Sequence, residues 1–350
     1  MTRALVVDDS HFMRTVITDI LESGGVEVVS QAKDGEQAVA AVEQYDPDVV
    51  TMDVEMPTLN GIEAVERIMD DHPVPILMLS AHTAEGAEAT FEALEKGAVD
   101  FLPKPGGEIS TELSSQRDRL VEKVTSVARA DVSGGTGTVS GTQPSTPAPG
   151  ARRNAYVEHP TLVIGASTGG PNVVESIVSA LPRDADLRLL IVQHMPGSFT
   201  KRFAKRLDAR SEYDIKEATD GDRISGGEGL VAKGEYHMNV SHYSGGRLRV
   251  RLTEEERLHG VRPAIDVTME SAASVVDDPL VGVVLTGMGN DGAAGIEAIK
   301  TAGGTTIAQN EATCSVFGIP ARAIETGCVD TVLPAGDISE EILRTITQER

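Results

Sequence analysis

The sequence predicts two α/β domains, each built on a mainly parallel β-sheet and joined to the other by one linker. The chain has 350 residues, more than a single hydrophobic core usually holds. Short β-branched segments alternate with helical stretches in both halves, which is typical of strands connected by crossover helices. A segment rich in Gly, Ser, Thr and Pro separates the halves, and this composition predicts a linker.

The first domain is predicted to span residues 1–128 and to contain a five-stranded, parallel, doubly wound sheet. Its strands are predicted from five short apolar segments: residues 4–7, 26–30, 49–52, 76–79 and 99–102. Stretches of roughly 10 to 20 residues separate these segments, which is long enough for a helix in each connection. Strands that alternate with helices in this way favour a sheet with helices on both faces.

The linker is predicted at residues 129–157 and the second domain at residues 158–350. Strand patterns return five times, at residues 161–165, 189–193, 281–285, 305–308 and 329–333. Between about 222 and 252, short alternating segments are broken by glycine pairs, which is typical of hairpins. We therefore expect a mainly parallel α/β domain with an antiparallel hairpin insertion.

Charge and composition argue against several classes of protein. The chain has 54 acidic and 31 basic side chains, a net charge of -23, whereas binding to a phosphate backbone needs a basic surface; no nucleic-acid partner is expected. No apolar run approaches the roughly 20 residues of a membrane span, so no membrane insertion is expected. Two cysteines cannot form a disulfide framework, and the start has no apolar leader. Both features favour a cytoplasmic location.

Polar residues stand where the strands of the first domain end. Asp8 and Asp9 follow the first strand, Asp53 the third, Ser80 the fourth and Lys104 the fifth. Functional groups gather at the carboxyl ends of parallel strands, and three carboxylates close together need a hard cation such as Mg²⁺. Any one of these residues could instead cap a helix, and for Ser80 alone that interpretation is favoured. Together they predict a magnesium site with Asp53 as a nucleophile toward phosphorus.

These strand-end residues resemble the receiver domains of two-component response regulators. The resemblance covers approximately residues 1–130. It implies that Asp53 is the phosphorylated residue and that Mg²⁺ is held by Asp8, Asp9, Asp53 and the main-chain carbonyl of Glu55. It also implies a chemotaxis histidine kinase as the phosphodonor.

The same resemblance implies a switch around the phosphorylated residue. Lys104 would pair with the acyl phosphate, and Ser80 would bind a phosphoryl oxygen and move its loop. Phe101 would change rotamer with that loop. A phosphoryl group adds nearly two negative charges and three acceptors, enough to bias a loop that has two arrangements.

Three residues of a possible catalytic triad follow strands of the second domain. Ser167 lies in GASTGG, a Gly-rich turn of the kind that exposes a serine hydroxyl between a strand and a helix. His194 lies in QHMP and Asp291 in TGMGNDG. Each has an alternative structural role: a phosphate-binding turn for Ser167, a capping or core position for His194, and an N-cap for Asp291. The chain order Ser, His, Asp differs from that of α/β-hydrolases, so ordinary lipase homology is not the explanation.

These motifs, with GVRPAID and NEATCSVFGIP, resemble the catalytic domain of chemotaxis protein-glutamate methylesterases, the CheB family. The resemblance covers residues 160–335 approximately. It implies that Ser167 attacks the ester carbonyl, that His194 is the general base and then the general acid, and that Asp291 orients His194. The main-chain N–H of Met288 would contribute to the oxyanion hole. Methyl-accepting chemotaxis receptors would be the substrate, and no cofactor is expected in this domain.

Several alternatives remain open at this stage. The enzyme could also deamidate receptor glutamines, because the acyl-enzyme would be the same. It could act on a different ester, or the second domain could be a non-catalytic interaction module that the receiver switches. A DNA-binding output is a third alternative. A basic segment at residues 201–206 could steer an acidic receptor helix or simply balance nearby acids.

The acidic composition predicts that stability depends on salt. The distance over which charges repel falls from about 10 Å at 0.1 M salt to about 3 Å at 1 M. If the acidity is an adaptation to concentrated salt, the Tm should rise with KCl well beyond about 0.1 M, which calorimetry can measure. A protein of balanced charge in the same salts is the control, and an unchanged Tm between those two concentrations would contradict the hypothesis.

Overall fold

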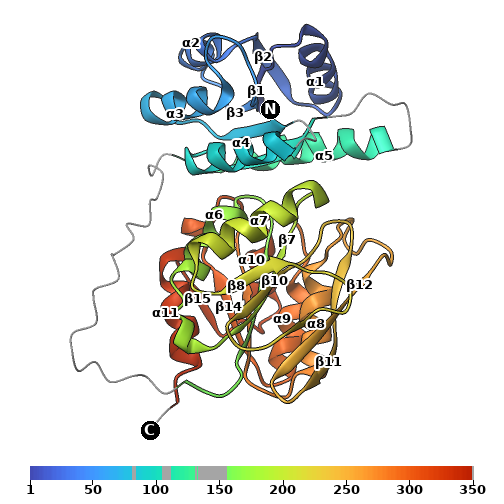
Figure 1. The fold of residues 1–350 in the computed structure, drawn as a ribbon. Coiled ribbons are helices and arrows are strands. Elements are labelled where there is room, and N and C mark those ends of the chain that lie inside the picture. Colours follow the sequence, from blue (N-terminus) through green and yellow to red (C-terminus); the bar gives the residue numbers. More distant parts are fainter. Residues whose placement is uncertain (81–83, 105–111, 131, 133–155, 349–350) are drawn as a thin grey trace, which may run out of the picture. The chain divides into compact units, whose positions relative to one another are not determined.

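The computed structural model describes residues 1–80, 84–104, 112–130, 132 and 156–348. The chain forms two compact units, Met1–Gly137 and Thr138–Arg350, which are described here one at a time (Figure 1). The predicted linker, residues 129–157, falls almost entirely outside the described residues. Both units are α/β, so the fold class predicted from the sequence is confirmed.

The first unit is built on a five-stranded parallel sheet. Its strands are β1 (Arg3–Val7), β2 (Glu27–Ala32), β3 (Val49–Asp53), β4 (Ile76–Ser80) and β5 (Asp100–Pro103). They lie in the order β2-β1-β3-β4-β5, and all neighbouring pairs are parallel. The strand order reverses between β1 and β3. In parallel α/β sheets, ligands bind outside the carboxyl ends of the strands at such a point.

Five helices connect and cover this sheet: α1 (His11–Ser23), α2 (Gly35–Tyr45), α3 (Gly61–Asp71), α4 (Ala84–Glu95) and α5 (Glu112–Val127). Helices α1 and α5 bury apolar side chains with β1, β3 and β4 in one continuous core cluster. The first three helices begin at residues that cap them with a side-chain oxygen: Ser10, Asp34 and Asn60. Each cap satisfies a backbone N–H in the first turn of its helix.

The second unit is built on a seven-stranded parallel sheet. Its strands are β6 (Thr161–Ala166), β7 (Arg188–Gln193), β8 (Asp214–Glu217), β10 (Glu228–Val231), β13 (Leu280–Val284), β14 (Thr305–Gln309) and β15 (Thr331–Leu333). They lie in the order β15-β14-β13-β6-β7-β10-β8. The chain first builds outward from β6 through β7, and later returns to build from β13 in the other direction. The order therefore reverses between β6 and β13, and this reversal predicts the place of a site.

The helices of the second unit are α6 (Gly170–Ser179), α7 (Gly197–Arg210), α8 (Ile265–Val275), α9 (Ala293–Thr301), α10 (Ile319–Glu325) and α11 (Ile338–Thr345). Short 3₁₀ turns lie at Arg183–Ala185, Glu311–Thr313 and Ala335–Asp337. Helices α8 and α9 pack against each other, and both contribute to one apolar core cluster of this unit. Within the described residues, no helix is both long and apolar enough to cross a membrane.

The segment predicted to form hairpins divides between two sheets. Strands β9 (Arg223–Ile224), β11 (His237–Ser244) and β12 (Arg247–Thr253) form an antiparallel sheet, as expected. Strand β10 instead pairs in parallel with β7 and β8 in the main sheet. It is short, with only four residues, and the glycine pair before it resembles a hairpin turn. Neither β10 nor the edge strand β8 was predicted as part of the parallel sheet.

Candidate functional site

An acidic cluster lies at the reversal point of the first sheet. Asp8 follows β1, Asp53 ends β3, and both side chains are buried. Lys104 follows β5, and its Nζ lies 2.8 Å from Asp8 Oδ2 and 2.7 Å from Asp53 Oδ2. Three of the residues predicted from strand ends are therefore in direct contact. The ammonium group offsets part of the repulsion between two buried carboxylates.

The raised pKa of Asp53 shows that this arrangement disfavours the ionised carboxylate. Burial raises the pKa of Asp53 to about 6, and the charge of Asp8 adds to the rise, although Lys104 opposes it. One lysine therefore does not compensate fully for the buried negative charge. A group that brings further positive charge would favour the ionised, nucleophilic form of Asp53.

The ligand atoms in the cluster suit a hard cation. Carboxylate oxygens of Asp8, Asp9 and Asp53 all lie within 4.8 Å of one another. Asp8 and Asp53 are buried, whereas Asp9 is exposed and lines a cavity of about 600 Å³ together with Glu55. Oxygen ligands of this kind fit Mg²⁺, which usually keeps several waters and so needs an open side. The cluster opens toward solvent on the side where Glu55 lies.

The two other residues predicted for the switch lie beside this cluster in neighbouring strands. Ser80 is the last residue of β4 and is buried, and its carbonyl oxygen accepts a hydrogen bond from Lys104 N at 2.8 Å. Phe101 lies in β5, one residue before Leu102, which pairs with Leu79 of β4. Its ring packs edge to face on Phe91 of α4, with ring centroids 6.0 Å apart. This aromatic contact links β5 to α4.

In the second unit, the three predicted triad residues converge at the reversal point of the sheet. Ser167 follows β6, His194 follows β7, and Asp291 lies in the loop between β13 and α9. Ala166 and Gln193 are paired across β6 and β7, so the residues that follow them, Ser167 and His194, lie on neighbouring chain ends. All three side chains are largely buried.

Within this group, His194 and Asp291 are in direct hydrogen-bonding contact. Nε2 of His194 lies 2.7 Å from Asp291 Oδ2. The same carboxylate accepts the backbone N–H of Ile265 at 2.7 Å and that of Asp266 at 2.9 Å. Burial disfavours the charge of Asp291, but the His194 ring and these two amides outweigh burial and hold its pKa below the ordinary value. Asp291 is therefore an ionised acceptor with fixed orientation.

Ser167 is positioned by its backbone. Its N–H donates to Thr286 O at 3.0 Å, and its carbonyl oxygen accepts from Gln193 Nε2 at 2.7 Å. Among the described residues, no hydrogen bond joins the Ser167 hydroxyl to His194. Such contacts are often long in a resting site and shorten when substrate binds. With Nε2 of His194 facing Asp291, Nδ1 is the ring nitrogen left to serve Ser167.

The loop after β13 brings a possible oxyanion donor to Ser167. Gly287 lies so close that a Cβ there would be 2.6 Å from Ser167 Cβ. The carbonyl oxygen of Gly287 accepts from the N–H groups of Gly318 and Ile319, which fixes this turn. The next residue, Met288, is half-buried, and its N–H has no acceptor among the described residues. A fixed, unpaired N–H is the kind of donor that an oxyanion hole requires.

The basic residues of α7, near His194, do not form a simple basic surface. On α7, Lys201 and Lys205 are exposed, but Arg206 and Arg210 both pair with the carboxylate of Glu175 on α6. Arg206, within the basic segment, and Arg210, just beyond it, thus hold two helices together. This favours the interpretation in which the basic segment balances nearby acids.

Sequence reasoning missed two residues that lie against the triad acid. Asp266 and His259 form a cluster with Asp291 in which the ligand-type atoms lie within 4.8 Å of one another. Asp266 was visible in the GVRPAID motif, but a carboxylate near the start of a helix is ordinarily a cap. No spacing rule predicts that His259, seven residues earlier, turns back onto it.

The fold and these two clusters define a class: a two-domain α/β protein with an acidic site in one unit and a Ser, His and Asp group in the other. Comparison with family models agrees with both parts. Residues 162–342 match the CheB methylesterase model, and residues 4–112 match the response regulator receiver domain.

Curated relatives match the whole chain. A protein-glutamate methylesterase/protein-glutamine glutaminase of Halobacterium salinarum is 64% identical over 346 residues, covering 99% of each chain. A relative of the same name from Haloarcula marismortui is 60% identical and covers 99% of this chain and 98% of its own. Among solved structures, the CheB methylesterase catalytic domain of Thermotoga maritima is 40% identical, with a TM-score of 0.51, over 53% of this chain and 97% of its own. The chain belongs to the CheB methylesterase family.

Because Gly287 touches Ser167, a single added methyl group should disturb the site. In Gly287→Ala, the new Cβ would also lie 2.7 Å from Ile319 Cδ1, so the loop must move and displace Ser167. We expect Ser167 to react roughly 10²-fold more slowly with a fluorophosphonate probe, because small misplacements of a catalytic group cost about that much. Gly336→Ala is the control, since a Cβ at that residue would meet no atom within 4 Å. Equal labelling rates in the two variants would contradict the packing argument.

Proposed function

We propose that this chain is a phosphorylation-activated serine hydrolase that removes methyl esters from glutamate side chains of chemotaxis receptors. The observation that carries the proposal is the contact of His194 with an ionised, fixed Asp291, since His194 follows the strand next to the one that leads to Ser167. Membership of the CheB methylesterase family and the names of the relatives support the substrate. Residues 158–350 would form the catalytic domain and residues 1–128 the receiver, with residues 129–157 as linker.

The proposed reaction begins with attack of Ser167 Oγ on the ester carbonyl carbon. As the new C–O bond forms, Nδ1 of His194 takes the hydroxyl proton, and Asp291 stabilises the resulting imidazolium through Nε2. The negative charge that develops on the carbonyl oxygen would be met by the N–H of Met288. The imidazolium then gives its proton to the departing methoxide, which leaves as methanol.

The second half returns the enzyme to its starting state. Water, deprotonated by His194 Nδ1, attacks the glutamyl ester on Ser167. The C–O bond to Ser167 breaks, and Oγ recovers its proton from His194, so that a glutamate carboxylate is released. A glutamine side chain would form the same acyl-enzyme with ammonia as the leaving group, which is the basis for deamidation as a second activity. No step requires a cofactor in this domain.

We infer that Asp53 is the phosphorylated residue and that Mg²⁺ binds beside it. Asp8, Asp9 and Asp53 would hold the ion with their carboxylates, and Glu55 with its main-chain carbonyl. The ion would supply positive charge that favours ionised Asp53 and offsets the charge of the phosphoryl oxygens. Lys104 would pair with the acyl phosphate, while Ser80 and Phe101 would carry the change toward α4. A chemotaxis histidine kinase as phosphodonor and a cytoplasmic location go with this proposal.

The first test is removal of the proposed nucleophile. Ser167→Ala should lower methanol release from methylated receptors by a factor on the order of 10⁶, since a triad nucleophile contributes about that much. Its Tm should change little, because Ser167 is held by backbone contacts that alanine keeps. Ser179→Ala, at the exposed end of α6, is the matched control and should retain full activity. Residual activity of more than a few per cent in Ser167→Ala would rule out the assignment.

The second test concerns control by the receiver. A small acyl phosphate with Mg²⁺ should raise methanol release by the full chain at least about fivefold, the lower end of ordinary coupling between two sites. Asp53→Asn should remain at the resting rate, because it lacks the carboxylate that accepts the phosphoryl group. Asp71→Asn, which changes an exposed carboxylate at the end of α3, should respond as the wild type does. Activation of Asp53→Asn would exclude this residue as the phosphorylation site.

A further inference from the structure

The starts of helices α8 and α9 exchange caps. Asp291, just before α9, accepts hydrogen bonds from Ile265 N and Asp266 N in the first turn of α8. Asp266 in turn accepts from Gly292 N at 2.8 Å and Gly295 N at 2.7 Å in the first turn of α9. Each helix therefore provides the carboxylate that satisfies the other. Two helix N-termini together favour two neighbouring negative charges.

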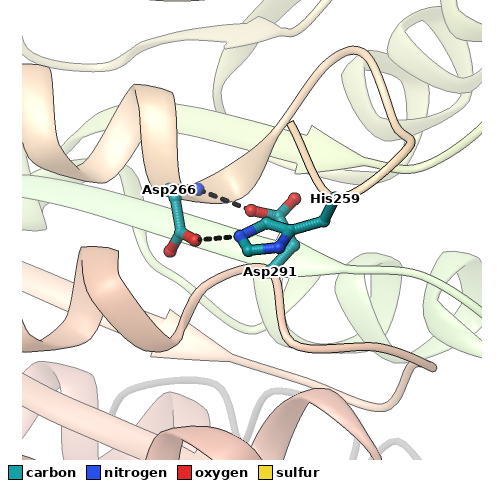
Figure 2. Close-up of side chains that lie close together, drawn as sticks. All are labelled: His259, Asp266 and Asp291. Atoms are coloured by element: carbon teal, nitrogen blue, oxygen red, sulfur yellow. Dashed lines mark hydrogen bonds and ion pairs between the residues drawn. The ribbon is translucent and has the colours of Figure 1, made fainter. Parts of the chain in front are cut away.

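A histidine completes this arrangement on the side away from His194. Nε2 of His259 lies 2.9 Å from Asp266 Oδ2, and Figure 2 shows the imidazole reaching the carboxylate from the loop before α8. The side chain of Asp266 is 2% exposed and that of His259 37% exposed. Hydrogen bonds thus connect His194 to Asp291, Asp291 to the backbone of Asp266, and the side chain of Asp266 to His259.

A two-residue turn holds His259 against Asp266. The turn is closed by a bridge between Leu258 and Val261. Its two central residues, His259 and Gly260, have φ of +53° and +77°, which is the ordinary conformation of such a turn. The turn directs the imidazole toward Asp266.

A metal ion is a poor explanation of the cluster. His, Asp and Asp are common metal ligands, but the two carboxylates already accept hydrogen bonds on every oxygen. Four of these donors are backbone N–H groups that cannot move without unwinding a helix start. A cation would therefore face N–H hydrogens where it needs free oxygen lone pairs.

The two carboxylates, Asp266 and Asp291, differ in how strongly their surroundings favour the ionised form. Burial and the charge of Asp291 raise the pKa of Asp266, although its amide donors and His259 oppose the rise. The pKa of Asp291 is held low, as described above. Asp266 is thus the member of the pair whose charge depends on an additional donor. Glu270 of α8, whose pKa is raised by burial and by both carboxylates, is the remaining acidic group that responds to them.

We propose that Asp266 and His259 are positioning residues for the triad, acting through Asp291. His259 keeps Asp266 ionised; ionised Asp266 fixes the start of α9 and adds a second negative charge behind Asp291. That charge favours the imidazolium form of His194 during the reaction. The inference rests on the proposed serine mechanism but does not depend on which ester is cleaved.

The Asp266→Asn variant separates the effect of the Asp266 charge from the effect of its hydrogen bonds to the start of α9. Asparagine Oδ1 can still accept from Gly292 and Gly295, but the negative charge is gone. Because His194 must be neutral to act as a base, the reaction slows toward acid pH. Loss of a nearby negative charge disfavours the imidazolium form, so the acid limb should move to lower pH. The expected shift is roughly one pH unit, because the lost charge lies just beyond Asp291 and acts on His194 through a medium of effective dielectric constant about 20.

The readout is the pH dependence of fluorophosphonate labelling of Ser167 in the full chain, which requires no receptor. His259→Ala should shift the acid limb in the same direction, because unpaired Asp266 then takes up a proton more readily. His259→Gln should restore the wild-type profile, since its amide can donate to Asp266. Glu270→Gln removes one negative charge nearby without touching Asp291, and its profile should move much less than that of Asp266→Asn.

Three results would overturn the inference. If the acid limb of Asp266→Asn does not move, whether or not the Tm falls, Asp266 acts only as a helix cap. If that variant does not fold, an unchanged profile in His259→Ala has the same force, because His259 lies on an exposed turn whose loss does not threaten the core. Absence of labelling in the wild-type chain would overturn the serine mechanism itself and this inference with it.

Discussion

The structure depends on the way parallel strands reverse their order within each sheet. At such a reversal, two neighbouring strands send their following loops to opposite faces, and the space between the loops cannot be filled by either connection. In the second unit, the reversal between β6 and β13 brings Ser167 against Gly287. In the first unit, the reversal between β1 and β3 brings Asp8 and Asp53 to one lysine. The same topological rule therefore places two unrelated chemistries.

Much of this arrangement could be predicted from the sequence, because β-branched segments separated by helical stretches give both the strands and their ends. Once the strands are parallel, polar residues such as Asp53 and Ser167 must lie along one edge of their sheet. The sequence does not give strand order. Strand β10 shows why strand order is hard to predict. It has four residues and follows a glycine pair, yet it lies between β7 and β8 and pairs in parallel with both.

Contacts between side chains and distant backbone were beyond prediction for a different reason. The motif that contains Asp266 was recognised, yet its carboxylate bonds to amides that lie 26 and 29 residues further along the chain. His259 reaches the same carboxylate from a two-residue turn in which both central residues have positive φ. Periodicity carries no information on either point.

The exchange of caps between α8 and α9 has a consequence for how this domain can change over evolutionary time. Ser167 contributes little to the fold beyond its backbone, so a lineage could discard the nucleophile and retain the scaffold for binding. Asp291 has no such freedom, because its carboxylate also holds the start of α8. Replacing it would leave two buried amides without partners, at a cost of about 1–3 kcal/mol each. A descendant without activity should therefore keep its aspartate long after it has lost its serine.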